Sequence, residues 1–79
     1  MPTLLRLNGI RFFFYSNENE EPIHVHVEKG DAHGKIWLEP SLEVDYLDGF
    51  SNSEQKNILE AIHKNSENFK KEWNEYFGK

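Results

Sequence analysis

The sequence contains no cysteine. Without thiols, the protein can form neither a disulfide-stabilised scaffold nor a zinc site that depends on thiolate ligands. A cysteine-free composition suits a reducing compartment, so we expect a cytoplasmic protein. With 79 residues, the chain is long enough for one small core, and we expect a single domain over residues 1–79.

Long apolar segments are also absent. No run approaches the roughly 20 apolar residues that cross a bilayer, so we expect no membrane partner. The opening stretch, MPTLLRLNGIRFFF, lacks a long apolar region followed by a small-residue cleavage site. We therefore expect no signal peptide.

Basic residues are scarce. The chain has 9 Lys and Arg against 14 Asp and Glu, which gives a net charge of −5 with neutral histidines. Nucleic-acid binding depends on clustered cations, so this balance disfavours nucleic acid as a partner, although Arg6, Arg11 and Lys35 could form a local patch. The same acidity suits a partner with a basic face.

The chain divides into two parts with different periodicity. Alternating apolar and polar residues over 3–47 predict strands, and a helical repeat follows over 51–77. This order is typical of an α+β domain. We expect an antiparallel β-meander of four to five strands, followed by a C-terminal helical segment packed on one face of the sheet.

Asn8-Gly9 predicts the first hairpin, because both residues accept the positive φ that a type I′ turn needs. The expected cross-strand pairs are Leu7–Ile10, Arg6–Arg11 and Leu5–Phe12. Two opposed arginines repel each other unless an acid or an anion lies between them. The pair of Arg6 and Arg11 therefore indicates either an anion site or two solvated cations.

A second hairpin follows a polar, acidic segment at 16–21 that we expect to be a loop. IHVHVEK, residues 23–29, alternates strictly, and Gly30-Asp31 predicts a type II′ turn because glycine fits its first central position. The expected polar pairs are His24–Trp37, His26–Lys35 and Glu28–His33, and the expected apolar pairs are Val25–Ile36 and Ile23–Leu38.

A third turn at 39–41 leads into another alternating strand. We expect Leu42, Val44 and Tyr46 to face the core, because strand side chains alternate between the two faces. Glu43 and Asp45 then point outward. The apolar pairs expected here are Ile36–Val44 and Leu38–Leu42.

The helical part begins at Ser51-Asn52-Ser53-Glu54, which has the capping-box pattern. The apolar residues near one helical stripe are Ile58, Leu59, Ile62, Phe69, Trp73 and Tyr76. One helix of about 24 residues would be roughly 36 Å long, which exceeds the width of a small domain. Asn65 and Ser66 also form helix poorly. We therefore expect one kinked helix or two helices, with the break near 63–66.

His24 and His26 lie one residue apart on one strand, so both imidazoles are expected on the same side. Such a pair can bind a metal ion, with Glu28, His33 or an acid from a neighbouring strand as further ligands. Histidine also carries protons near neutral pH, as a small nuclease requires. Equally, the rings can belong to a partner-binding surface or make ordinary cross-strand contacts. The sequence has no second HxH, no HExxH and no glycine-rich phosphate loop, so these interpretations stay open.

Several of these residues occur in the order of a known pattern. It comprises Arg6, Gly9-Ile10, Tyr15, an acidic loop, Pro22-x-His24-x-His26-Val27, Gly30 and an Ile-x-Leu strand. This pattern resembles a family of short bacterial proteins, domain-of-unknown-function family 4160. The C-terminal segment, with Glu60, His63 and Trp73, is similar to that family's helical end, so the resemblance covers nearly the whole chain.

One part of the family pattern is absent. The family has an Asp-His or Glu-His before a Pro-Pro-His-x-His core, whereas residues 19–23 here read NEEPI. The upstream histidine and the second proline are missing, so the resemblance transfers His24 and His26 but no three-histidine site. It implies no established chemistry. It implies a gene beside another small uncharacterised domain, as in toxin–antitoxin pairs or mobile-element cargo.

Together, these observations favour a small cytoplasmic bacterial interaction or regulatory protein over an enzyme. We expect it to act without a cofactor, through a protein partner, in a toxin–antitoxin-like, mobile-element or phage-defence context. Tryptophan and arginine are favoured anchors of protein interfaces, so the candidate functional surface comprises His24, His26, Trp37, Arg6 and Arg11. An exposed edge strand could also pair two copies into a homodimer.

Two alternatives stay open. A small histidine- or metal-dependent nuclease would use His24 and His26, with Glu28 and His33 as further metal ligands. A nucleic-acid-binding regulator would use the face that carries Arg6 and Arg11, and its affinity would fall steeply with salt concentration.

Overall fold

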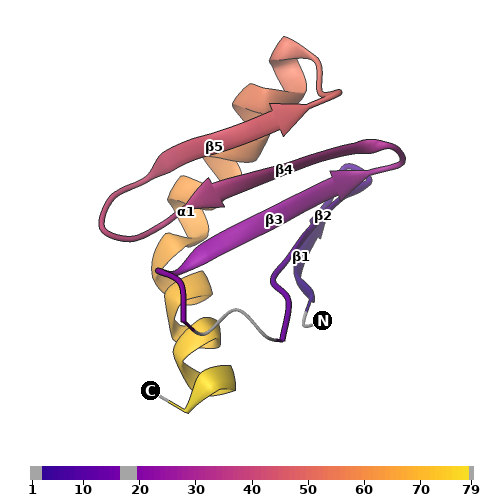
Figure 1. Cartoon of the computed structure of the whole chain (residues 1–79). Helices are drawn as coiled ribbons and strands as arrows, with labels where there is room; N and C mark the ends of the chain where they lie inside the picture. Colours follow the sequence, from indigo (N-terminus) through magenta and orange to yellow (C-terminus); the bar gives the residue numbers. More distant parts are fainter. Residues whose placement is uncertain (1–2, 17–19, 79) are drawn as a thin grey trace.

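The computed structural model describes residues 3–16 and 20–78, which form five strands and one helix (Figure 1). The elements in chain order are β1 (Thr3–Leu7), β2 (Ile10–Phe13), β3 (His24–Lys29), β4 (Ala32–Trp37), β5 (Glu43–Asp48) and α1 (Asn52–Phe77). The strands form an antiparallel sheet in the order β1-β2-β3-β4-β5, with β1 and β5 at its edges. The predicted α+β meander followed by a C-terminal helix is confirmed.

Both predicted hairpin turns are present. Asn8 and Gly9 have φ of 52° and 79°, the positive values of a type I′ turn, and Gly30 has φ of 58° between β3 and β4. The predicted registers are confirmed, with the pairs Leu7–Ile10, Arg6–Arg11, Leu5–Phe12, His24–Trp37, Val25–Ile36, His26–Lys35 and Glu28–His33. Of the loop predicted at 16–21, residues 17–19 lie outside the described residues, and the rest belongs to neither a strand nor the helix.

The pairing of β4 with β5 departs from the expected alternation. The observed pairs include Ile36–Val44, as predicted, then Lys35–Tyr46 and Gly34–Leu47. Asp45 is therefore an extra residue in β5, and such a bulge reverses the faces of the residues beyond it. The prediction that Tyr46 faces the core is wrong. Its side chain lies on the same face as Lys35, and Leu47 packs against the core instead.

Gly34 accounts for the close approach of the two strands at this bulge. A Cβ on Gly34 would lie 2.7 Å from the backbone oxygen of Tyr46 and 2.5 Å from the Cδ2 atom of Leu47. A glycine inside a strand marks this kind of close backbone approach. Gly34 is therefore the sequence signal from which the bulge could have been predicted.

The start of α1 is fixed by the predicted capping box. The Ser51 hydroxyl accepts a hydrogen bond from the Glu54 N–H, and the Glu54 carboxylate accepts one from the Ser51 N–H. Lys29, at the end of β3, also donates to Glu54 over 2.7 Å. The hydrogen bond from Lys29, followed by that from Ser51, lowers the pKa of Glu54 below its ordinary value. One carboxylate thus caps the helix and ties it to the sheet.

The rest of α1 runs without interruption. Where the sequence predicts one kinked helix or two helices, the structure has a single helix that continues through residues 63–66. Asn65 and Ser66 fit into it because each side chain donates a hydrogen bond to a carbonyl oxygen three or four residues earlier. Local hydrogen bonds thus offset the weak helix propensity of these two residues.

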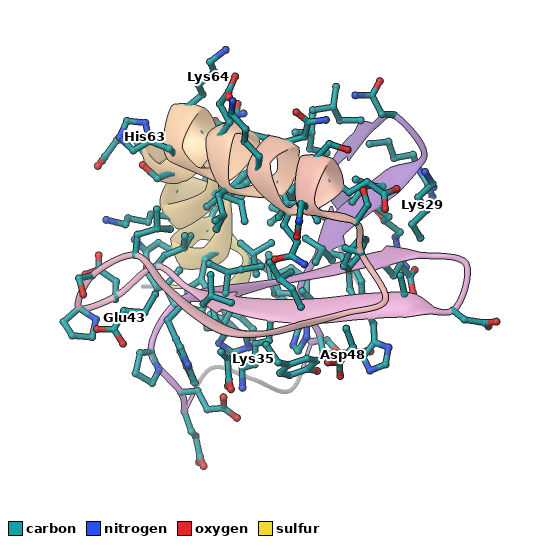
Figure 2. All side chains as sticks on the ribbon, turned by 90° about the horizontal axis from the view of Figure 1, so that it is seen from above. Lys29, Lys35, Glu43, Asp48, His63 and Lys64 are labelled. Carbon is teal, nitrogen blue, oxygen red and sulfur yellow. The ribbon has the colours of Figure 1, made fainter. Side chains whose placement is uncertain are left out.

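Helix α1 covers one face of the sheet, called the inner face below (Figure 1). The core between them includes Phe12, Val25, Val27 and Ile36 from the sheet and Ile58, Ala61, Ile62 and Phe69 from the helix. On the opposite, outer face, Lys35 and Asp48 point away from α1, while His63 and Lys64 extend from the far side of the helix (Figure 2). Among the described residues, no helix is long and apolar enough to cross a membrane.

Candidate functional site

The outer face brings together the side chains that the sequence singles out. Alternation and register place on it Arg6 of β1, Arg11 and Phe13 of β2, His24, His26 and Glu28 of β3, His33, Lys35 and Trp37 of β4, and Tyr46 and Asp48 of β5. All five residues of the predicted functional surface therefore share one face. They differ widely in how accessible they are.

His24 is the least accessible of them, because none of its surface is exposed. Its Nδ1 atom lies 2.8 Å from the carbonyl oxygen of Pro22. Since a carbonyl only accepts hydrogen bonds, Nδ1 carries the hydrogen, and the lone pair of the neutral ring is on Nε2. The carboxylate of Glu21 lies 3.9 Å from the same Nδ1. The residues just before β3 thus set the tautomer and the orientation of His24.

The ring of His24 joins two groups of aromatic side chains. The outer cluster lies on the outer face and comprises Phe13, Tyr15, His26 and Trp37. The inner cluster lies toward α1 and comprises Phe14, Trp73, Tyr76 and Phe77. The centroid of the His24 ring is 5.1 Å from those of His26, Trp37 and Trp73 alike. Rings from both clusters therefore cover His24, which the hairpin register alone does not reveal.

His26 is half-buried within the outer cluster. Its ring stacks on Phe13, with centroids 5.6 Å apart, and meets Tyr15 edge-on at 4.7 Å. Aromatic pairs at such separations contribute beyond their buried area. Both histidines of the HxH pair are therefore packed against rings, and His26 is the one that retains access to solvent.

Arg11 is held by neighbours on both sides of β2. Its guanidinium donates to Glu28 on β3 and to Thr3 on β1, each over 2.9 Å, and lies 4.4 Å from the centroid of the Phe13 ring. Only 16% of its side chain is exposed. The opposed arginines of the first hairpin thus differ, because Arg11 pairs with an acid of the next strand while Arg6 is exposed.

Lys35 is held in a similar way on β4. Its ammonium donates to Glu21 over 2.9 Å and lies 4.3 Å from the centroid of the Trp37 ring. A cation over an indole face is attracted by the ring quadrupole. Lys35 and Trp37 therefore form one preformed unit on the outer face.

The four metal candidates do not form one ligand group. Glu28 lies four residues from His24 along β3, about 13 Å at 3.3 Å per residue, and its carboxylate bonds to Arg11. His33 is exposed at the opposite end of the hairpin, with Nε2 4.0 Å from Asp48. Within the described part of the chain, no three His, Cys, Asp or Glu side chains are grouped so that they could hold a metal ion.

Strand β5 and the residue before it carry exposed apolar side chains that the sequence assigns to the core. Leu42 is 42% exposed, Val44 45% and Tyr46 36%, so the predicted burial of these three residues is wrong. They lie at the edge of the sheet, and three exposed acids, Glu43, Asp45 and Asp48, lie among and beyond them. Residues 42–48 are called the β5 edge below.

A separate groove of about 260 Å³ lies between β1 and α1. Leu5, Leu7, Asn8, Asn57, Glu60, Ala61, Lys64 and Asn65 line it. Its lining thus comprises three apolar residues, three amides, one acid and one cation. None of the predicted site residues is among its lining residues, so the groove is distinct from the outer face.

Comparison with known proteins identifies the family. No curated protein and no solved structure matches the chain. A family model described as a domain of unknown function (DUF4160) matches residues 9–74 of the 79. The matched segment runs from the first hairpin turn to the inner cluster and includes the HxH pair and the β5 edge. The chain therefore belongs to the DUF4160 family.

Proposed function

We propose that this protein is a small cytoplasmic bacterial interaction protein, and that it binds a protein partner with the β5 edge and the adjoining outer face. The observation that carries the proposal is the grouping of exposed apolar side chains. Six large hydrophobic side chains are exposed in the described residues, and three of them are Leu42, Val44 and Tyr46. Exposed apolar side chains gathered at one place are typical of an interaction site.

The outer face next to β5 supplies side chains that anchor protein interfaces. Trp37 pairs with Glu43 and Lys35 pairs with Tyr46 across the sheet. Because Lys35 already lies over the Trp37 ring, these side chains lose little freedom when a partner arrives. Trp37 therefore stays a contact candidate, together with the exposed Arg6.

The state of the histidines and cations supports binding over catalysis. A catalytic base must come within hydrogen-bonding distance of its substrate, and His24 has no exposed surface. Arg11 and Lys35 are each paired with a carboxylate, so less of their charge is available to phosphates. Both alternatives, a small nuclease and a nucleic-acid-binding regulator, need that charge.

The biological setting rests on the family resemblance alone. A toxin–antitoxin-like, mobile-element or phage-defence context stays a prediction, in which this chain acts on or with another small protein. A search for the partner in cells tests both the setting and the binding surface.

The experiment places a photo-crosslinking amino acid at position 46 in bacterial cells. The control carries it at position 63, because His63 is exposed on the far side of α1 (Figure 2). We expect a discrete adduct with one protein from position 46 and none from position 63. A nuclease-sensitive adduct would favour a nucleic-acid partner instead. No adduct from position 46 would contradict the proposal.

A further inference from the structure

The β5 edge has a free strand side as well as exposed side chains. Among the described strands, β5 pairs with β4 alone, so its backbone groups on the other side can hydrogen-bond to a further strand. Apolar and acidic residues alternate from Leu42 to Asp45. A strand that paired there would meet apolar side chains and carboxylates in turn.

The acids of the β5 edge differ from most acids on this protein. Six other carboxylates pair with a lysine or an arginine, namely Glu21, Glu28, Glu39, Glu54, Glu60 and Glu75. In the described residues, by contrast, no lysine or arginine lies within 4.0 Å of the carboxylates of Glu43, Asp45 or Asp48, and His33 reaches Asp48 at 4.0 Å. Within the described part of the chain, the edge therefore presents negative charge that no lysine or arginine offsets.

This charge disfavours a second copy of the chain as the occupant. Pairing β5 with β5 of another copy would bring two sets of three acids together, and like charges on paired strands repel. Pairing β5 with β1 of another copy would leave a free edge at each end, so the assembly would not close. Acids on an edge strand also protect it from self-pairing.

We infer that the β5 edge binds an extended segment of another protein, in which apolar residues alternate with lysine or arginine. The segment adds a strand to the sheet beside β5. Its backbone bonds to the free side of β5, its apolar residues pack on Leu42 and Val44, and its cations pair with the acids. This inference rests on the proposed function and specifies how the partner is held.

The probe is a short synthetic peptide of alternating valine and lysine, capped at both ends. Its matched control has the same side chains but N-methylated alternate amides, which cannot form the strand hydrogen bonds. We expect the unmodified peptide to shift the backbone amide resonances of residues 43–48 and to slow their hydrogen exchange. The affinity of the methylated peptide should be lower by about tenfold or more, because several backbone hydrogen bonds are lost.

Two protein variants test the charge. Glu43→Lys/Asp45→Lys should lower the affinity for the unmodified peptide by about tenfold, since two cross-strand attractions become repulsions. Glu67→Lys/Glu72→Lys changes the net charge equally at exposed positions on α1 and should change the affinity much less. Equal weakening by both variants, or equal binding of both peptides, would show general electrostatic attraction and overturn the inference.

Further outcomes distinguish a failure of this inference from a failure of the proposed function. Resonance shifts confined to β1 would place the partner elsewhere and overturn strand addition at β5. Self-association of the protein would do the same if the Glu43→Lys/Asp45→Lys variant associates as strongly as wild type. If the crosslink at position 46 forms while the peptides fail to bind, strand addition is wrong and the proposed function stands. If the crosslink is also absent, both are wrong.

Discussion

The two faces of the sheet are ordered by different means. The inner face is covered by α1, and its side chains are buried in a continuous apolar core. The outer face has no helix over it in the described part of the chain, yet Phe13 there is only 3% exposed. Arg11 covers that ring from above and is itself held by Glu28. On the outer face, cations that are paired with acids thus cover aromatic rings that would otherwise need a second layer of secondary structure over them.

This difference predicts how each face responds to mutation. The inner face depends on the volume of its side chains, because close packing leaves few voids. The outer face depends on pairs of charges and rings, and exposed pairs of this kind contribute little each. Substitutions of exposed residues on the outer face should therefore change recognition more than stability, and those of buried residues toward α1 should do the reverse.

The largest effect is expected from Trp73→Ala, which removes the centre of the inner cluster. Trp73 is 1% exposed and contacts Phe14, His24 and Phe77. We expect a loss of about 3–5 kcal/mol in the free energy of unfolding, measured by urea denaturation. Trp73→Phe keeps a ring there and should remain folded. A Trp73→Ala variant as stable as wild type would mean that the inner cluster does not hold the fold.

The next effect sharpens the comparison within the HxH pair. His24→Ala should cost about 2–4 kcal/mol, as for other large-to-small changes at fully buried positions, whereas His26→Ala should cost about 1 kcal/mol because His26 is half-exposed. Thermal denaturation of both variants under one buffer condition gives the comparison. Equal losses at the two positions would contradict the burial that distinguishes them.

A smaller effect is expected where β4 meets β5. Gly34→Ala places a Cβ against the backbone oxygen of Tyr46 and the side chain of Leu47. Because the backbone cannot move aside as a side chain can, we expect a loss of about 1–3 kcal/mol, measured by urea denaturation. The double variant Gly34→Ala/Leu47→Ala should recover none of it. Recovery in the double variant would show that the added Cβ clashes only with the Leu47 side chain and not with the backbone oxygen of Tyr46.

The smallest effect is expected from the link between β3 and α1. Because the pKa of Glu54 is lowered mainly by Lys29, its carboxylate stabilises the fold above its unfolded-state pKa. That contribution is lost as the pH falls through its folded-state pKa. Glu54→Gln keeps the capping side chain and removes the charge. The difference in unfolding free energy from wild type should be present at neutral pH and vanish in acid. A difference that stays constant across this range would contradict the assignment.

Lys29→Met serves as the matched control for that prediction, because it removes the cation and leaves the cap of α1 in place. It should lower the stability at neutral pH and show the same loss of effect in acid. If Glu54→Gln shows this pH dependence and Lys29→Met does not, the hydrogen bond from Ser51 rather than that from Lys29 lowers the pKa of Glu54.

The hairpins were predictable because their information is local. Asn8-Gly9 and Gly30 fix the turns, and the alternation of IHVHVEK then fixes which residues pair and which face each other. The capping box at Ser51 placed the start of the helix for the same reason. Each of these signals is contained within a few neighbouring residues.

The rest depended on contacts between distant segments. The burial of His24 requires Trp73, which reaches it only once α1 has packed on the sheet. The exposure of Tyr46 requires the bulge that Gly34 permits on the neighbouring strand. The unbroken helix requires side-chain hydrogen bonds that offset poor propensity at Asn65. Alternation and propensity describe single segments, so they could not supply these three results.

The contact between Phe14 and Trp73 also sets an order of events during synthesis. A ribosome adds about 5–20 residues per second, so roughly 3 to 12 s separate these two residues as they are made. In that interval the hairpins can already pair, because their contacts are local. The apolar rings of Phe14 and its neighbours, however, still lack their helical cover. The newly made chain is therefore most open to aggregation, and to chaperones, until the second half of α1 has emerged.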